Sequence, residues 1–133
     1  LDDLYEGWSG LDSVWPRLEE QVLRPLAAGE AARWQRYDWE LEAFAEWNEL
    51  PVPPVLVLEG SGSAPRVLGS RAVLVVFVEA PWDIRLARGL DRDGVGLTEE
   101  WHRWQALESR HFAQEHTRTR ADVVIDGTRP VLP

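Results

Sequence analysis

The sequence lacks three residue types, and each absence narrows what the chain can do. It has no cysteine, which excludes disulfide bonds and thiolate metal sites and indicates a reducing compartment. It has no lysine, because all 14 basic residues are arginine, so these 133 residues hold no G-x-x-x-x-G-K-[ST] phosphate loop. It has no methionine and begins at Leu1, from which we expect a processed or partial chain.

Long apolar runs and an excess of positive charge are also lacking. No apolar run reaches the roughly 18 residues that a membrane span requires, and no signal peptide is visible, so we expect a cytoplasmic protein with no membrane partner. The net charge of −9 argues against binding to nucleic acid. Acids outnumber arginines up to residue 84, whereas the two are balanced over residues 85–129, where we expect an anion to bind.

Apolar runs that alternate with helical patterns fill most of the chain. Apolar residues at helical spacing predict a helix over residues 11–26. The aromatic-rich segment 33–50 favours a loose hairpin that turns near residues 41–43, although residues 40–46 could equally form a helix. We expect three further apolar strands and two further helices: strands over residues 55–60, 72–79 and 121–126, and helices over residues 81–92 and 98–115.

This alternation predicts an α/β fold in a single domain, residues 1–133. Continuous apolar strands between helices indicate a parallel sheet that helices cover on both faces. The length suffices for one hydrophobic core, and the sequence shows no repeat and no convincing internal boundary.

Acids at the chain start and at a strand end are the candidates for acid–base and metal chemistry. Asp2 and Asp3 could hold a general base or a magnesium ion, although paired acids at a chain end are usually only solvated. Glu59 closes an expected buried strand, at the edge where α/β sheets place ligand-binding residues. An acid in that position often organises Mg²⁺ or water near phosphates, and a capped loop is an equal alternative.

Arginines on one face of an expected helix are the candidates for phosphate binding. At about 100° per residue, Arg85, Arg88 and Arg92 fall within about 60° of one another. Their guanidinium groups match phosphate oxygens, so the helix suits a site that grips a polyphosphate. The alternative is a solvated helix face on which the arginines pair with acids such as Asp91 and Asp93.

Two motifs in the first half of the chain, DDLY at residues 2–5 and RYDW at residues 36–39, resemble the uridine kinase-like branch of the P-loop kinases, specifically the uridine kinase-like proteins of actinobacteria. The first is similar to the motif after the second strand of those kinases, whose first Asp takes the proton from the acceptor hydroxyl. The resemblance implies that Asp2 is the base and Asp3 its neighbour, or the reverse. The second is similar to the segment that packs on the nucleoside base; on residue types alone, its rings could also be core.

Three segments further along the chain extend the resemblance. Residues 56–60 (LVLEG) are similar to the Walker-B-like strand, residues 77–93 to the strand and lid helix that clamp the phosphates of ATP, and residues 121–127 (ADVVIDG) to the last strand, after which the backbone borders the adenine. The resemblance implies that ATP is bound by the lid arginines and the end of the last strand: Arg85, Arg88, Arg92, Gly127 and Thr128.

The resemblance implies a three-layer P-loop NTPase-like parallel sheet with helices on both faces. The first strand, phosphate loop and first helix of the family would precede Leu1, so we expect this chain to lack them and to form the C-terminal two-thirds of a nucleoside-kinase-like domain. The implied activity is ATP-dependent phosphoryl transfer to a hydroxyl of a nucleoside-like small molecule, for which the chain is not competent without that loop. The implied cofactors are ATP and Mg²⁺, with Mg²⁺ at Asp2 and, through water, at Glu59.

The implied site contains two groups of residues besides those at the phosphates. The catalytic acids are Asp2, Asp3 and Glu59, and the residues that contact the acceptor are Tyr5, Arg36, Tyr37 and Trp39. Two other hypotheses stay open. The chain could be a non-catalytic remnant that binds a partner or forms a homodimer, or a small metal-dependent phosphohydrolase that uses the three acids and turns over without ATP.

Overall fold

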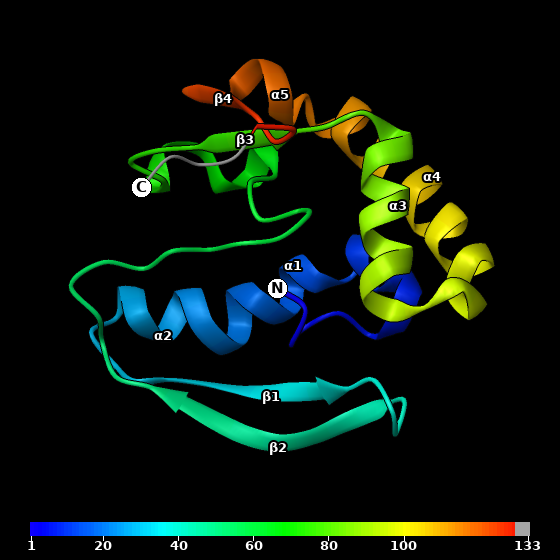
Figure 1. The fold of residues 1–133 in the computed structure, drawn as a ribbon. Coiled ribbons are helices and arrows are strands. Elements are labelled where there is room, and N and C mark those ends of the chain that lie inside the picture. The colour runs from blue at the N-terminus through cyan, green and yellow to red at the C-terminus, as the bar shows by residue number, and fades with distance from the viewer. Residues whose placement is uncertain (130–133) are drawn as a thin grey trace. The chain divides into compact units, whose positions relative to one another are not determined.

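The computed structural model describes residues 1–129, which form a mixed α/β protein with two small sheets (Figure 1). The chain divides into two compact units, Leu1–Ser63 and Ala64–Pro133. The first unit contains an antiparallel pair of strands and the second a parallel pair. Each unit therefore has a sheet and helices of its own.

The first unit opens with a helical run where the sequence predicts one helix. The segments follow one another as η1 (Gly7–Asp12), α1 (Val14–Leu18), the π-helical turn η2 (Glu19–Leu23) and α2 (Arg24–Ala27). Pro25 lies in the first turn of α2 and has no N–H to donate to the turn before it, which accounts for the wider turn there. The predicted apolar stripe is confirmed by the buried side chains Leu11, Val14, Leu18 and Val22.

A β-hairpin follows, as the aromatic-rich segment predicts. β1 (Ala32–Asp38) pairs antiparallel with β2 (Ala43–Leu50), and the chain turns between them over residues 39–42. The alternative helix over residues 40–46 is therefore wrong. Aromatic side chains won over the local helix propensity because they pack across the two strands.

A β-bulge in β1 decides which side chains face the helical run. The register shifts between Gln35 and Tyr37, so Tyr37 follows Ala32 and Trp34 on the inner face, although strict alternation would place the residue before it there. Ala32 and Tyr37 are buried and Trp34 is half-buried. β1 packs against η2 through this face.

The strand predicted over residues 55–60 is wrong. Residues 51–64 contain no strand, and the side chains of Val55 and Val57 are 74% and 80% exposed. A strand forms only where a neighbour accepts its backbone hydrogen bonds, and no described strand pairs with this segment. The prolines just before it also lack the N–H that a ladder needs.

The second unit contains the other predicted helices, and shorter strands where the sequence predicts residues 72–79 and 121–126. Its elements are η3 (Arg66–Arg71), β3 (Val76–Glu79), α3 (Trp82–Asp93), η4 (Val95–Leu97), α4 (Thr98–Glu115), α5 (Thr117–Arg120) and β4 (Val123–Asp126). Gly89 brings α3 close to α4, because a Cβ there would lie 2.5 Å from the ring of Trp101. The helices predicted over residues 81–92 and 98–115 are confirmed.

The two strands of the second unit are parallel, as predicted, but their sheet is smaller and more open than predicted. β3 and β4 pair in register from Val76 opposite Val123 to Glu79 opposite Asp126. Every residue of β4 is exposed, so the predicted sheet with helices on both faces is not seen in the described residues. A sheet of two strands has no central strand to bury, and the three-layer parallel sheet is not formed by residues 1–129.

Candidate functional site

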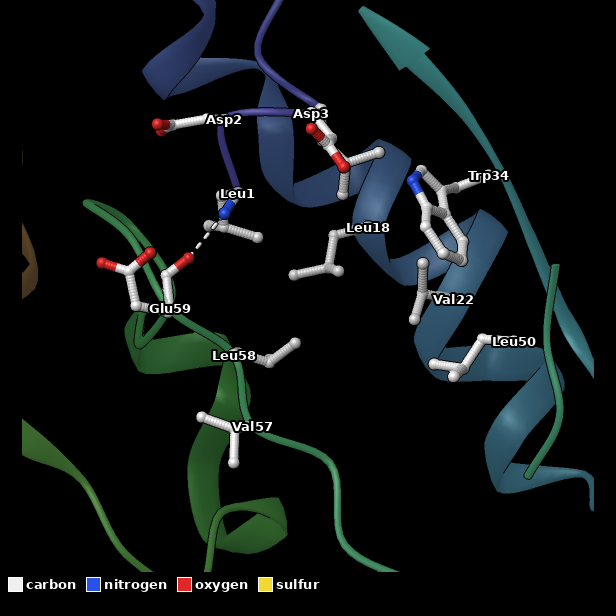
Figure 2. A pocket seen from close by; sticks show the side chains of 11 residues that line it. Leu1, Asp2, Asp3, Leu18, Val22, Trp34, Leu50, Val57, Leu58 and Glu59 are labelled. Atoms are coloured by element: carbon white, nitrogen blue, oxygen red, sulfur yellow. Dashed lines mark hydrogen bonds between the residues drawn. The ribbon is translucent and has the colours of Figure 1, made fainter. Parts of the chain in front are cut away.

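A pocket of about 310 Å³ lies in the first unit, beside the start of the chain (Figure 2). Its apolar floor comes from the helical run, the hairpin and the segment after it, and includes Leu18, Val22, Leu50 and Leu58. Three acidic residues, Asp2, Asp3 and Glu59, are among the residues that line it, and the carboxylate of Glu59 is directed away from the apolar floor. The volume is at the lower end of the range of roughly 300–1,000 Å³ that small-molecule sites occupy.

The three predicted catalytic acids thus meet at one place although they come from distant parts of the sequence. The Leu1 nitrogen donates a hydrogen bond to the carbonyl oxygen of Glu59 at 2.5 Å, which joins the two segments. Gly60 permits this approach, because a Cβ there would lie 3.2 Å from the Leu1 nitrogen and its φ is 124°. The contact brings the backbone of the first segment to that of the second, so that residues of both line the same pocket.

The two neighbouring aspartates differ in direction. Figure 2 shows the carboxylate of Asp3 directed toward the side of the pocket that holds Leu18 and Trp34, whereas the carboxylate of Asp2 points away from them. Trp34 was not among the predicted site residues. Trp34 is two residues after Ala32 on the same strand, a spacing that indicates a shared face. Nothing in the sequence separates a residue that lines a pocket from one that packs in the core.

Tyr37 and Trp39, the predicted aromatic pair, do not line the pocket but donate hydrogen bonds to the backbone of the two aspartates. The Tyr37 N–H donates to the carbonyl oxygen of Asp3 at 2.7 Å, and the Trp39 Nε1–H donates to the carbonyl oxygen of Asp2 at 3.3 Å. The Tyr37 ring meets the rings of Trp39 and Phe44 edge to face, at centroid distances of 5.4 and 5.2 Å. Burial in this cluster raises the pKa of Tyr37 above its ordinary value.

The other two predicted acceptor residues also lie outside the pocket lining. Tyr5 is buried, and its hydroxyl donates to the carbonyl oxygen of Ser61 at 2.6 Å. Arg36 forms ion pairs on the hairpin with Glu46 at 2.5 Å and with Asp38 at 2.8 Å. The pKa of Glu46 is lowered, chiefly by its hydrogen bond from Arg36. Both side chains therefore have partners within the fold.

Two of the three lid arginines are held by acids of the second unit. Arg85 pairs with Glu108, whose side chain is only 10% exposed, and donates from Nε to the Ala80 carbonyl oxygen at 3.1 Å. Arg92 donates to both carboxylate oxygens of Asp93 at 2.7 and 3.0 Å, which lowers the pKa of that acid. For these two arginines the structure agrees with the alternative of paired side chains.

Arg88 differs from the other two. It is exposed, and its Nη1 donates to the carbonyl oxygen of Gly127 at 2.8 Å. Among residues 1–129, no carboxylate pairs with it. Two predicted phosphate-binding residues therefore do meet, at the end of β4, and Arg88 retains N–H groups that can turn to an anion.

Strand-end acids that the sequence reasoning did not assign to the site also gather at this edge. Glu79, at the end of β3, accepts two hydrogen bonds from Arg118 at 2.7 and 3.0 Å, which lower its pKa. Asp126, opposite it in the register, accepts from the Thr128 hydroxyl at 2.6 Å and the Thr128 N–H at 2.9 Å, which lower its pKa too. Both acids close apolar runs, the same signal that singled out Glu59.

No group of three or more His, Cys, Asp or Glu side chains within residues 1–129 is arranged to hold a metal ion. Over the same part of the chain, none of the helices combines the length and apolarity needed to cross a membrane. Comparison with protein-family models, curated proteins and solved structures gives no match to this chain.

Proposed function

We propose that this chain supplies the acceptor site and the lid of an ATP- and Mg²⁺-dependent kinase that phosphorylates a hydroxyl of a nucleoside-like small molecule. One observation carries the proposal: Asp2, Asp3 and Glu59 line one pocket of small-molecule size. A small-molecule kinase needs such a grouping, because one carboxylate accepts the proton of the attacking hydroxyl while others stand near the metal.

The directions of the side chains suggest different roles for the three acids. Asp3 is the base, because its carboxylate points into the part of the pocket that an acceptor would fill. Asp2 and Glu59 would hold Mg²⁺, the latter through water. Their carboxylates fit that ion, because Mg²⁺ is usually bound by one or two carboxylates together with phosphate oxygens and water, without a cage of three protein ligands. The metal would draw charge from the transferring phosphate.

Arg88 supplies the positive charge of the lid. It stands beside Gly127 without a carboxylate partner among residues 1–129, whereas Arg85 joins α3 to α4 through Glu108 and Arg92 is paired with its neighbour Asp93. The phosphate loop of such a kinase lies outside these residues, because its lysine has no counterpart in the sequence. The proposal includes the three-layer P-loop sheet, in which the exposed strands β3 and β4 would be covered.

The test is an assay of the complete protein with Mg²⁺-ATP and uridine, followed by mass spectrometry of the product. We expect a phosphorylated nucleoside that forms only when both ATP and Mg²⁺ are present. Adding EDTA serves as the control for the metal, and omission of uridine serves as the control for ATP hydrolysis. Absence of any phosphorylated product would overturn the proposal, and hydrolysis of a phosphate ester without ATP would point to the phosphohydrolase instead.

A second candidate, a partner-binding module, is favoured by the exposed apolar strands of the second unit. Val78 is 61% exposed, and Val123, Val124 and Ile125 are 41–42% exposed. Apolar strands of this kind are ready to pair with another chain. Light scattering and a turnover assay of the complete protein distinguish the two: a stable dimer that lacks ATP-dependent turnover supports the module, and a monomer with turnover supports the kinase.

A further inference from the structure

We propose that Trp34 determines acceptor specificity in the pocket of the first unit: its indole stacks on the ring of an uncharged nucleoside, and the acidic rim rejects acceptors that already carry a phosphate. This inference rests on the proposed function and specifies which residue reads the acceptor. It assigns the stacking role to a residue other than Tyr37 and Trp39, which the sequence motif suggests.

Trp34 lies where it can contact a ligand in the pocket. Trp34 lies on β1, half-buried, and lines the pocket together with Leu18, Val22 and Leu58 (Figure 2). An indole beside three aliphatic side chains forms an apolar surface large enough for a planar ring. Stacking of a base on an aromatic side chain needs only such a face and no hydrogen-bond pattern.

The aromatic side chains of Tyr37 and Trp39 are packed against other rings of the fold. Tyr37 and Trp39 do not line the pocket, and their rings already pack against each other, against Phe44 and against Trp8. None of the ring contacts within residues 1–129 involves Trp34. The indole of Trp34 is therefore the aromatic surface that a ligand in this pocket can reach.

The charged residues that line the pocket are acidic. Asp2, Asp3 and Glu59 line the pocket, and among the described residues no arginine or histidine lines it. When Mg²⁺ and ATP are absent, a phosphate group on an acceptor would meet the like charge of the Asp3 carboxylate, which points into the pocket, and this lowers affinity several-fold even at exposed sites. An uncharged nucleoside meets no such repulsion, so the pocket distinguishes uridine from uridine 5′-monophosphate.

Trp34→Leu in the complete protein tests the inference, because leucine keeps an apolar side chain but removes the aromatic face. We expect the Kd for uridine, measured by isothermal titration calorimetry, to rise on the order of 10-fold to 100-fold, with the KM rising in parallel and kcat within about threefold of the wild type. Trp34→Phe should restore most of the affinity. Trp47→Ala is the matched control, because Trp47 is an exposed tryptophan of the same hairpin outside the pocket.

The outcomes separate this inference from the proposed function. Turnover with uridine that Trp34→Leu and Trp47→Ala affect equally would overturn the role of Trp34 and leave the kinase standing. Uridine binding that depends on Trp34, in a protein without turnover, would support the pocket and contradict the kinase. With Mg²⁺ and ATP absent, uridine 5′-monophosphate that binds as tightly as uridine, or uridine that does not bind to the folded wild type, would overturn the inference.

Discussion

The two units differ in whether their predicted functional residues are engaged in ion pairs within the fold. In the first, the predicted acids line a pocket, and the aromatic residues beside them hold their backbone in place. In the second, two of the three predicted phosphate-binding arginines are paired with acids, and Arg88 alone among them lacks a carboxylate partner within residues 1–129. A motif residue is thus a stronger candidate for function when the fold leaves its charged group without an opposite charge.

The largest effect that follows from this comparison concerns Asp3. If Asp3 is the base, Asp3→Asn should lower kcat for uridine phosphorylation by about 100-fold to 10,000-fold, which is the usual contribution of a general base. Asp2→Asn should lower kcat less and raise the Mg²⁺ concentration needed for half-maximal rate. Steady-state kinetics against Glu40→Gln, an exposed acid of the hairpin turn, supplies the control. Equal effects at both aspartates would remove the distinction between them.

The next largest effect sharpens the distinction among the arginines. Arg88→Ala in the complete protein should lower kcat by roughly 100-fold, because it removes a positive group from the transferring phosphate, while the KM for uridine changes little. The free energy of unfolding should stay close to that of the wild type, since Arg88 is exposed and bonds only one carbonyl group. An unchanged kcat would contradict the proposal that Arg88 acts on the transferring phosphate.

Arg85→Ala should show the opposite pattern, a loss of stability. Removing Arg85 leaves the nearly buried carboxylate of Glu108 without this partner, and we expect the free energy of unfolding to fall by about 2 kcal/mol, less than for a fully buried pair because Arg85 is partly exposed. Urea denaturation measures the change. Arg103→Ala is the control, because its ion pair with Glu100 is a surface pair on one helix and should contribute under about 0.5 kcal/mol. Similar losses in both variants would contradict the structural role of Arg85.

The smallest expected effect concerns acid stability at the edge of the parallel sheet. Arg118 lowers the pKa of Glu79 below its ordinary value of 4.5, so the stability from this pair is complete above that pH and is lost as the pH falls through the lowered pKa. Arg118→Ala should therefore lower the free energy of unfolding at pH 7 slightly and flatten its decline between about pH 5 and 3. Urea denaturation across that range, with Arg103→Ala beside it, measures the difference. A decline as steep as that of the wild type would show that the pair does not persist in solution.

Local patterns were enough to predict the hairpin and the two long helices. The aromatic residues around Tyr37 and Phe44 favoured strands, and the helical spacing over residues 98–115 was strong enough to fix α4. Features that depend on a distant partner could not be predicted in this way. The segment 55–60 has the composition of a buried strand but no neighbouring strand, and Arg85 finds Glu108 on another helix, 23 residues away.

The candidate site shows the same division. The sequence singled out Asp2 and Asp3 as paired acids at the chain start, and Glu59 as the end of a strand that the structure does not form. Which of Asp2 and Asp3 points into the pocket depends on the directions of two neighbouring side chains, and the bulge in β1 decides that Tyr37 and not Arg36 shares the inner face with Trp34. Such single-residue shifts exchange the two faces of a strand and leave no trace in composition or periodicity.

The most direct test of the central claim is a crystal structure of the complete protein with uridine and a non-hydrolysable ATP analogue. The account predicts that uridine occupies the pocket of the first unit, with its ring on Trp34 and a hydroxyl within about 2.6–3.2 Å of the Asp3 carboxylate. Uridine bound elsewhere, or a pocket that stays closed to it at saturating concentration, would contradict the claim that these acids form the acceptor site.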